Sequence, residues 1–271
     1  EAVPDADAVV MVVPLVVDDE SRPDFRAMDA AGVDAFIIGD LGAFAVAGEV
    51  APRVERHVST QASVANATAA RVWHSLGASR VVCAREMSLA DIACLRQDAP
   101  PDLEIEAFAH GAMCMAVSGR CLISSYLTGR SGNKGHCTQP CRWSYQLGTA
   151  AFEEFAPPEA PTGFLLEEEK RPGEYFPIGE DAGGAFILNS RDMCMIDHVP
   201  ELMDAGLDSL KIEGRAKSAY YAAIVTAAYR HAIDAARAGE PLDPVWRAEV
   251  DKVSHRPYST GFYYGPPGQY Y

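Results

Sequence analysis

The chain has 271 residues and a formal net charge of -15, with an apolar fraction of 48% and a charged fraction of 23%. These proportions are ordinary for a globular protein and exclude disorder as the main state, and the length allows one large α/β domain or one domain with an excursion. The acidic total argues against non-specific nucleic-acid binding, which depends on neutralisation of phosphates by Lys and Arg, but it leaves room for a local basic site.

The N-terminal part contains the longest apolar run, Ala8 to Val17, which is interrupted by Pro14. It is about half as long as the roughly 20 residues that cross a bilayer, so we expect no membrane association. The N-terminus also lacks the three-part pattern of a secretory signal, which predicts a cytoplasmic location. In that reducing compartment, seven cysteines favour metal ligation or unpaired thiols over disulfides.

From Arg22 onward, short apolar runs alternate with stretches of helical periodicity. This alternation is typical of parallel strands joined by crossover helices, as in a parallel barrel or a doubly wound sheet. A late helix is expected to begin at the N-cap Ser218 and to end before Gly239. The expected strands are Ala35–Gly39, Arg56–Thr60, Arg80–Cys83, Glu104–Ala109, Ala185–Leu188 and Ser209–Glu213.

Polar side chains follow the ends of these strands, where ligands bind in parallel sheets. Some have an equally good structural explanation, since Asp40 or Gln61 could simply cap a helix or shape a turn. Ile212 should point to one face of its strand and send Lys211 and Glu213 to the other. Such a charged pair either forms a structural ion pair or binds an anion or substrate. The full set is Asp40, Gln61, Arg85, Glu86, His110, Lys211, Glu213 and Arg215.

The segment from His110 to Tyr145 holds four of the seven cysteines and no Asp or Glu. Thiolates select zinc or iron–sulfur clusters, and the cations between them would suit an anionic ligand. The segment therefore predicts a metal or cluster site beside an anion. Its cysteines are Cys114, Cys121, Cys137 and Cys141, and its cations are Arg120, Arg130, Lys134 and Arg142.

The spacing of the cysteines favours a cluster over zinc. Zinc fingers usually show two close pairs, and here only Cys137 and Cys141 are close, so thiols from separated loops are more plausible. Cys194 is a fifth candidate, expected in the first turn of a helix that begins after Ser190, where backbone amides favour a thiolate. Cys83 and Cys94 are expected in the core. A nucleophilic cysteine with His110 as its base is also possible, although no feature selects one thiol.

Two long stretches strongly resemble the collagenase-like peptidase family of unassigned catalytic type, number thirty-two (peptidase family U32). They are EAFAHGAMCMAVSGRCLISSYLTGRSGNKGHCTQPCRWSY and LNSRDMCMIDHVPELMDAGLDSLKIEGRAKSAYY. The upstream stretches GVDAFIIGDLGAF, HVSTQASVANATAARVW and SRVVCAREMSL look like the same family. The tail, HAIDAARAGEPLDP and KVSHRPYSTGFYYGPPGQYY, is most similar to the branch that hydroxylates the wobble uridine of tRNA at carbon five.

The resemblance implies an α/β, TIM-like (β/α) barrel, here without its first two strands, that carries a four-iron (4Fe-4S) cluster. Cys114, Cys121 and Cys137 would be ligands, with Cys194 or Cys141 as the fourth. The implied organisation is residues 1–109 for the first part of the barrel, 110–150 for the cluster segment, 151–183 for an acidic insertion, 184–240 for the last part of the barrel and 241–271 for a C-terminal helix and aromatic tail.

The thiols and cations together with the resemblance lead us to expect iron–sulfur RNA modification with a small carboxylated donor, and the resemblance implies tRNA as the substrate and prephenate as that donor. Catalytic roles are assigned to His110, Lys211, Glu213 and Arg215, and an electron-transfer or family protein would be a partner. Substrate contacts are assigned to Arg120, Arg130, Lys134, Arg142, Gln61 and Glu86. The alternatives are a peptidase, for which no catalytic motif is evident, and a non-catalytic scaffold that binds zinc.

Overall fold

The structure is a computed structural model that describes residues 10–12, 22–113, 124, 130, 138–139, 164–167, 175–181, 184–187, 191–214 and 217–265. In these ranges, eight strands form one sheet and three strands form a second, antiparallel sheet. None of the helices in the described ranges combines the length and the apolar content that a bilayer crossing requires.

The first five strands of the main sheet are parallel and follow chain order. Side-chain caps start the intervening helices: Asp40 accepts from the Ala43 N–H, and Asn66 and Ser88 act in the same way further on. The strands are β1 (Val10–Val12), β2 (Ala35–Ile38), β3 (Glu55–Val58), β4 (Arg80–Val82) and β5 (Glu104–Ala112). The helices are α1 (Arg22–Ala30), α2 (Leu41–Val50), η2 (Thr60–Ala62), α3 (Ala67–Ser75) and α4 (Leu89–Asp98).

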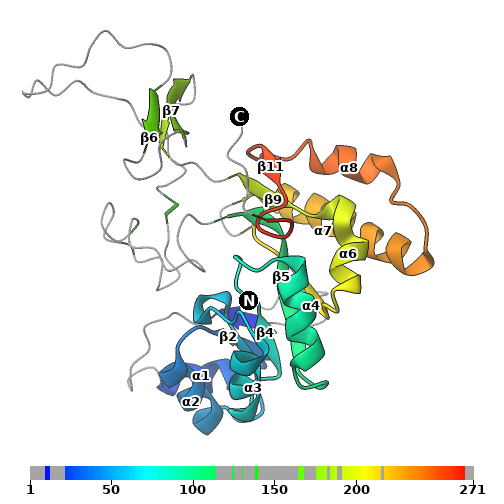
Figure 1. Ribbon diagram of the computed structural model, residues 1–271. Coiled ribbons are helices and arrows are strands. Elements are labelled where there is room, and N and C mark those ends of the chain that lie inside the picture. The colour runs from blue at the N-terminus through cyan, green and yellow to red at the C-terminus, as the bar shows by residue number, and fades with distance from the viewer. Residues whose placement is uncertain are drawn as a thin grey trace, which may run out of the picture.

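Strand β5 is the branch point of the sheet. Its first part pairs in parallel with β10, and its last part pairs antiparallel with β9, which in turn pairs with β11. Helices α1–α3 and helices α6–α8 consequently lie on opposite sides of β5 (Figure 1). The later elements are β9 (Asp192–Cys194), η6 (Ile196–His198), α6 (Val199–Asp204), β10 (Ser209–Ile212), α7 (Ala219–Ala238), α8 (Pro244–Val250) and β11 (Tyr258–Ser259).

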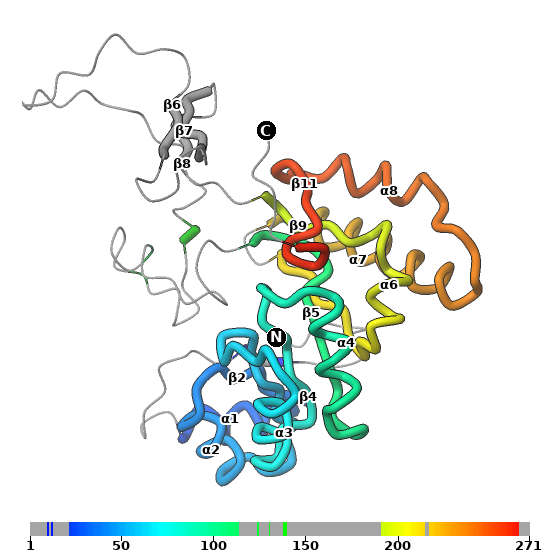
Figure 2. The backbone as a smooth tube through the Cα atoms, viewed as in Figure 1, coloured from blue at the N-terminus to red at the C-terminus, as the bar shows by residue number. Residues whose placement is uncertain are grey.

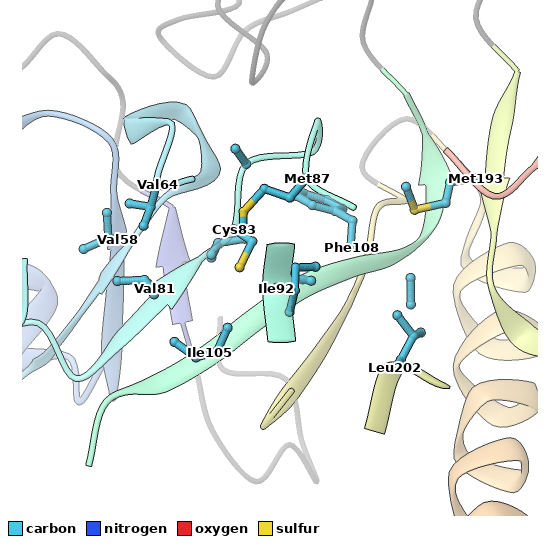
Figure 3. Close-up of a cluster of buried hydrophobic side chains, with 14 of the residues drawn as sticks. Val58, Val64, Val81, Cys83, Met87, Ile92, Ile105, Phe108, Met193 and Leu202 are labelled. Atoms are coloured by element: carbon cyan, nitrogen blue, oxygen red, sulfur yellow. The ribbon is translucent and has the colours of Figure 1, made fainter. Parts of the chain in front are cut away.

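The core lies between the sheet and the helices that cover it. Val58, Val81 and Ile105 are register neighbours on β3, β4 and β5 and are fully buried. Ile92 of α4 and Leu202 of α6 belong to the same buried cluster (Figure 3). This continuous apolar layer orients β5 and therefore fixes where its carboxyl end lies.

The expected strands at 35–39, 56–60, 80–83, 104–109 and 209–213 are confirmed with small shifts in their ends. The strand expected at 185–188 is found as β8 (Gly184–Ile187), but its place in the parallel sheet was wrong. It pairs antiparallel with β7 (Tyr175–Asp181), which also pairs with β6 (Phe164–Glu167). Only two residues separate β7 from β8, so a local hairpin is the connection that such a short turn permits.

Two expectations about cysteines were also wrong. Cys194 lies in strand β9 and not in the first turn of a helix, because the end of β5 offers backbone partners that Cys194 and Met193 occupy. Cys94 is exposed on α4, because that helix turns Ile92 and Leu95 toward the core instead. Cys83 is buried directly after β4, as expected.

The fold is a mixed α/β structure built on parallel strands. In the described ranges the parallel run extends from β1 to β5 and β10, and no described strand joins β10 to β1. Strand β11 pairs with β9 and lies beside it, although more than 60 residues separate the two strands in sequence (Figure 2).

Candidate functional site

At its carboxyl end, strand β5 changes from parallel pairing with β10 to antiparallel pairing with β9. The register between β10 and β5 shifts between Lys211 and Ile212, so that Ile212 lies opposite His110. Gly111 follows with φ +113, and a Cβ at this position would lie 2.4 Å from the backbone oxygen of Glu213. Because glycine has no Cβ, the backbone at Gly111 can lie close to the backbone at Glu213, at the point where the parallel strands end.

His110 lies inside a cage of aromatic rings and is 1% exposed. Its ring centroid lies 5.5 Å from that of Tyr229, 5.4 Å from that of Tyr258 and 5.9 Å from that of Tyr221. Nδ1 is 3.3 Å from the Tyr229 hydroxyl. Burial lowers the pKa of His110 to about 4, against an opposing effect of Asp192, so the imidazole is neutral at physiological pH.

Cys194 is the register partner of His110 across β5 and β9 and is 8% exposed. Nη1 of Arg247 donates to its Sγ at 3.0 Å. Burial raises the pKa of the Cys194 thiol. The backbone N–H of Ile196 and the guanidinium of Arg247 act in the opposite direction, because each favours the thiolate. The sulfur is therefore buried yet surrounded by hydrogen-bond donors, as metal-binding thiolates are.

Lys211 meets a carboxylate, but that carboxylate belongs to Glu106 in β5. Its Nζ lies 3.3 Å from Glu106 Oε1, and Ser209 donates to Glu106 Oε2 at 2.8 Å. Arg80 Nη1 lies 3.2 Å from the same carboxylate. Burial alone would raise the pKa of Glu106, but Lys211, Ser209 and Arg80 together hold it below its ordinary value. Lys211 thus forms a structural ion pair, as considered from the sequence, but its partner is Glu106 and not Glu213.

A second cation converges on the same region. Phe108, 6% exposed on β5, has the Arg85 guanidinium 3.9 Å from its ring centroid and Lys211 Nζ at 5.6 Å. Arg85 also donates to the Ala112 carbonyl at 2.8 Å. Both cations lie near the carboxyl ends of β4, β5 and β10, where an anionic small molecule would bind in a parallel sheet.

The other predicted site residues divide into two groups. Asp40 is the N-cap of α2, Gln61 lies in η2, Glu86 is exposed after β4, and Glu213 uses its backbone N–H on the His110 carbonyl at 2.9 Å. Arg130 is described and exposed. The remaining predictions fall outside the described residues: Cys114, Cys121, Cys137, Cys141, Arg120, Lys134, Arg142 and Arg215.

Ser124 connects the described positions of the cysteine-rich segment. Its hydroxyl donates to the Arg130 carbonyl at 2.6 Å and accepts from the Thr138 N–H at 3.1 Å. Ser124 is 2% exposed. Positions 124 and 138 are therefore in direct contact.

Sequence reasoning missed four residues of this region. Tyr229 and Arg247 lie on helices where their partners are more than 30 residues away, so no local pattern identified them. Asp192 is 1% exposed, with Lys217 Nζ at 3.7 Å and the Arg256 N–H at 3.2 Å. Glu106 was read only as part of a strand, although a glutamate inside a buried strand was a signal that could have been used.

The sequence model described as Peptidase family U32 matches residues 10–271. "tRNA hydroxylation protein P" of Escherichia coli (strain K12) is 40% identical over 259 residues, which is 88% of this chain and 57% of that protein. "23S rRNA 5-hydroxycytidine C2501 synthase" of the same organism is 34% identical over 221 residues, 80% of this chain and 29% of that protein. The chain spans about half the length of the first of these relatives.

Among solved structures, the U32 peptidase Mk0906 matches 40% of this chain and 47% of its own chain, with 16% identity and a TM-score of 0.33.

Proposed function

The chain belongs to peptidase family U32, and from this membership we propose that it acts in RNA hydroxylation, with tRNA as its substrate. The observation that carries the proposal is the 40% identity with a tRNA hydroxylation protein over 88% of the chain. The finer proposal is hydroxylation of the wobble uridine at carbon five. A relative named for 5-hydroxycytidine supports the ring position, because it is also 34% identical to this chain.

We further propose a 4Fe-4S cluster, with Cys194 as its fourth ligand beside Cys114, Cys121 and Cys137. The surroundings of Cys194 support this choice, because its sulfur is shielded from solvent and accepts a charge-assisted hydrogen bond from Arg247. A cluster would supply electron transfer, while Arg247 would stabilise the ligating sulfur.

The donor proposed for the reaction is a small carboxylated molecule such as prephenate. Arg85 and Lys211 near Phe108 support an anion site at the carboxyl ends of the strands. Glu213 and Arg215 lie two and four residues after Lys211 and would complete the site in the proposal. An electron-transfer or family protein is proposed as the partner that delivers electrons to the cluster.

The test of the RNA substrate is mass spectrometry of tRNA from cells that lack the protein. We expect 5-hydroxyuridine derivatives to disappear and to return when the gene is restored. Restoration with the Cys194→Ser variant should fail, whereas Cys94→Ser, which changes an exposed thiol on α4, should succeed. Unchanged tRNA in a strain without a second family member would contradict the proposal.

The test of the cofactor is the metal content of protein purified without oxygen. Iron and acid-labile sulfide with visible absorbance are expected from the cluster. Stoichiometric zinc with no visible absorbance would instead favour the zinc scaffold.

We also propose that the parallel strands belong to a TIM-like barrel. The chain order of β1 to β5, the parallel addition of β10 and the intervening helices support it. Among the described strands β1 pairs with β2 alone, which supports further pairing at its other edge. An experimental structure in which more strands join β10 to β1 is the expected result, and a sheet that ends at β1 would contradict the barrel.

Peptide cleavage is the second candidate, favoured by the name of the family. The placement of His110 offers it little support, because its ring is caged by tyrosines and its Nδ1 is engaged by Tyr229. Peptidase activity of the purified protein that is lost in His110→Gln but kept in His74→Gln, a change on the exterior of α3, would revive this candidate.

A further inference from the structure

Helix α8 presents Arg247 to three partners at once. Nη1 donates to Cys194 Sγ at 3.0 Å. Nε lies 3.4 Å from Asp197, and Nη2 lies 3.2 Å from Asp251. The carboxylates are about half exposed, whereas Cys194 is 8% exposed, so the guanidinium is held between the surface and a buried sulfur. The carboxylates and Tyr258, whose ring centroid is 5.3 Å from Cζ, fix its direction before any ligand binds.

We infer that Arg247 is a positioning residue that raises the reduction potential of the cluster bound through Cys194 and slows the loss of its iron. This inference rests on the proposed function, which makes Cys194 a ligand. One-electron reduction adds one negative charge to a cluster, so a cation donating to a ligating sulfur stabilises the reduced form more than the oxidised form. The same hydrogen bond holds the sulfur in place when iron dissociates.

A purely structural role for Arg247 predicts something different. Arg247 joins α8 to η6 through Asp197, and removing that connection would lower the stability of the fold. It would not change the potential of a cluster that still binds. The midpoint potential therefore separates the two roles, and it can be measured without RNA.

The experiment compares the wild-type chain with Arg247→Met and Arg247→Gln, each reconstituted without oxygen with iron and sulfide. The control is Arg230→Met. This substitution removes an exposed guanidinium on α7 that pairs with Asp234 of α7. For Arg247→Met we expect a midpoint potential lower by about 59 mV, the equivalent of a tenfold change for one electron. We also expect roughly tenfold faster transfer of iron to a chelator. Arg230→Met should match the wild type in both measurements.

Arg247→Gln is the second variant in case Arg247→Met does not fold, because it also removes the charge and the Nη1 donor to Cys194 but stays polar beside Asp197 and Asp251. We expect its midpoint potential to be lowered and its iron loss to be faster as well. A wild-type potential and rate of iron loss in either folded variant would overturn the inference and leave the cluster proposal standing. Wild-type protein that binds neither iron nor sulfide would overturn both. The two failures are therefore distinguishable.

Discussion

At the scale of single residues, Tyr229 connects the parts of the candidate site. Its hydroxyl donates to the Ala109 carbonyl at 2.7 Å and accepts from the Met195 N–H at 2.9 Å. The same oxygen contacts His110, and burial raises the pKa of Tyr229 well above its ordinary value. The phenol therefore remains protonated and joins β5 to the turn that follows Cys194.

We expect Tyr229→Phe to lower the free energy of unfolding by about 1–2 kcal/mol. The ring packing remains, and the Met195 N–H keeps the Ala109 carbonyl at 3.0 Å, so the loss is limited to the hydroxyl's own bonds. Urea denaturation measures the change. Tyr220→Phe, at a residue that is 56% exposed, is the control and should change stability by less than about 0.5 kcal/mol. Equal effects of the two substitutions would contradict the role of the buried hydroxyl.

The carboxylate of Glu106 predicts how stability depends on pH. Its pKa in the folded protein is lower than its ordinary value, because Lys211, Ser209 and Arg80 outweigh the effect of burial. Its contribution to stability is therefore complete above the unfolded pKa of about 4.3 and is lost as pH falls through the folded pKa.

We expect Glu106→Gln to cost about 2 kcal/mol at pH 7, since it leaves Lys211 and Arg80 with less compensation, and to cost much less at pH 3. Thermal unfolding at both pH values measures this difference. Glu104→Gln, which alters the half-exposed partner of the same Arg80, should cost at most about 1 kcal/mol. A cost of Glu106→Gln that is the same at both pH values would show that the pair does not act through charge.

At the scale of elements, the approach of β10 to the end of β5 decides the geometry of the site. The extra residue of β5 at the register shift brings His110 opposite Ile212, and Gly111 has no Cβ that would collide with Glu213. A second glycine, Gly239, has φ +69 at the end of α7 but faces open space. Both glycines have a positive φ, but only at Gly111 would a Cβ also collide with neighbouring atoms, so substitutions at the two positions distinguish backbone strain from steric collision.

We expect Gly239→Ala to destabilise by about 1 kcal/mol, because alanine is strained at positive φ. Gly111→Ala should cost at least twice as much, because its Cβ would also meet backbone at 2.4 Å. Chemical denaturation of both variants measures the comparison. Similar costs would mean that β10 can move away from β5 without penalty.

At the scale of the whole molecule, the charge of -15 means that the proposed RNA binding would have to be local. The candidate contact is Arg130, which is exposed and belongs to the acid-free segment from His110 to Tyr145. Phosphate contacts of this kind release counterions and make affinity depend on salt.

We expect Arg130→Gln to weaken tRNA binding regardless of sequence and to reduce the slope of log affinity against log salt by about 0.9. Arg26→Gln is the control, because it removes another exposed cation, which lies on α1 and outside that segment. Binding titrations at several salt concentrations measure both. An unchanged slope in Arg130→Gln would place the phosphate contacts elsewhere.

Much of the fold could be predicted from the sequence. The strands at 35–38, 55–58, 80–82, 104–112 and 209–212 follow from apolar runs, and the start of α7 follows from Ser218 as its cap. These features depend on neighbours within a few residues, where periodicity and capping act directly. The sequence also indicated the family, and the cysteine-rich segment stays a prediction.

Only the tertiary structure decided which side chains meet at the end of β5. Cys194 and Arg247 are 53 residues apart, and Lys211 meets Glu106 instead of the neighbouring Glu213. Contacts of this kind depend on how strands are ordered and where register shifts, and the residue types alone leave both open. The sequence by itself determined the elements and the stock of thiols and cations. The branching of β5 decided which of them share a site, because it brings β9, β10 and α7 to one strand end.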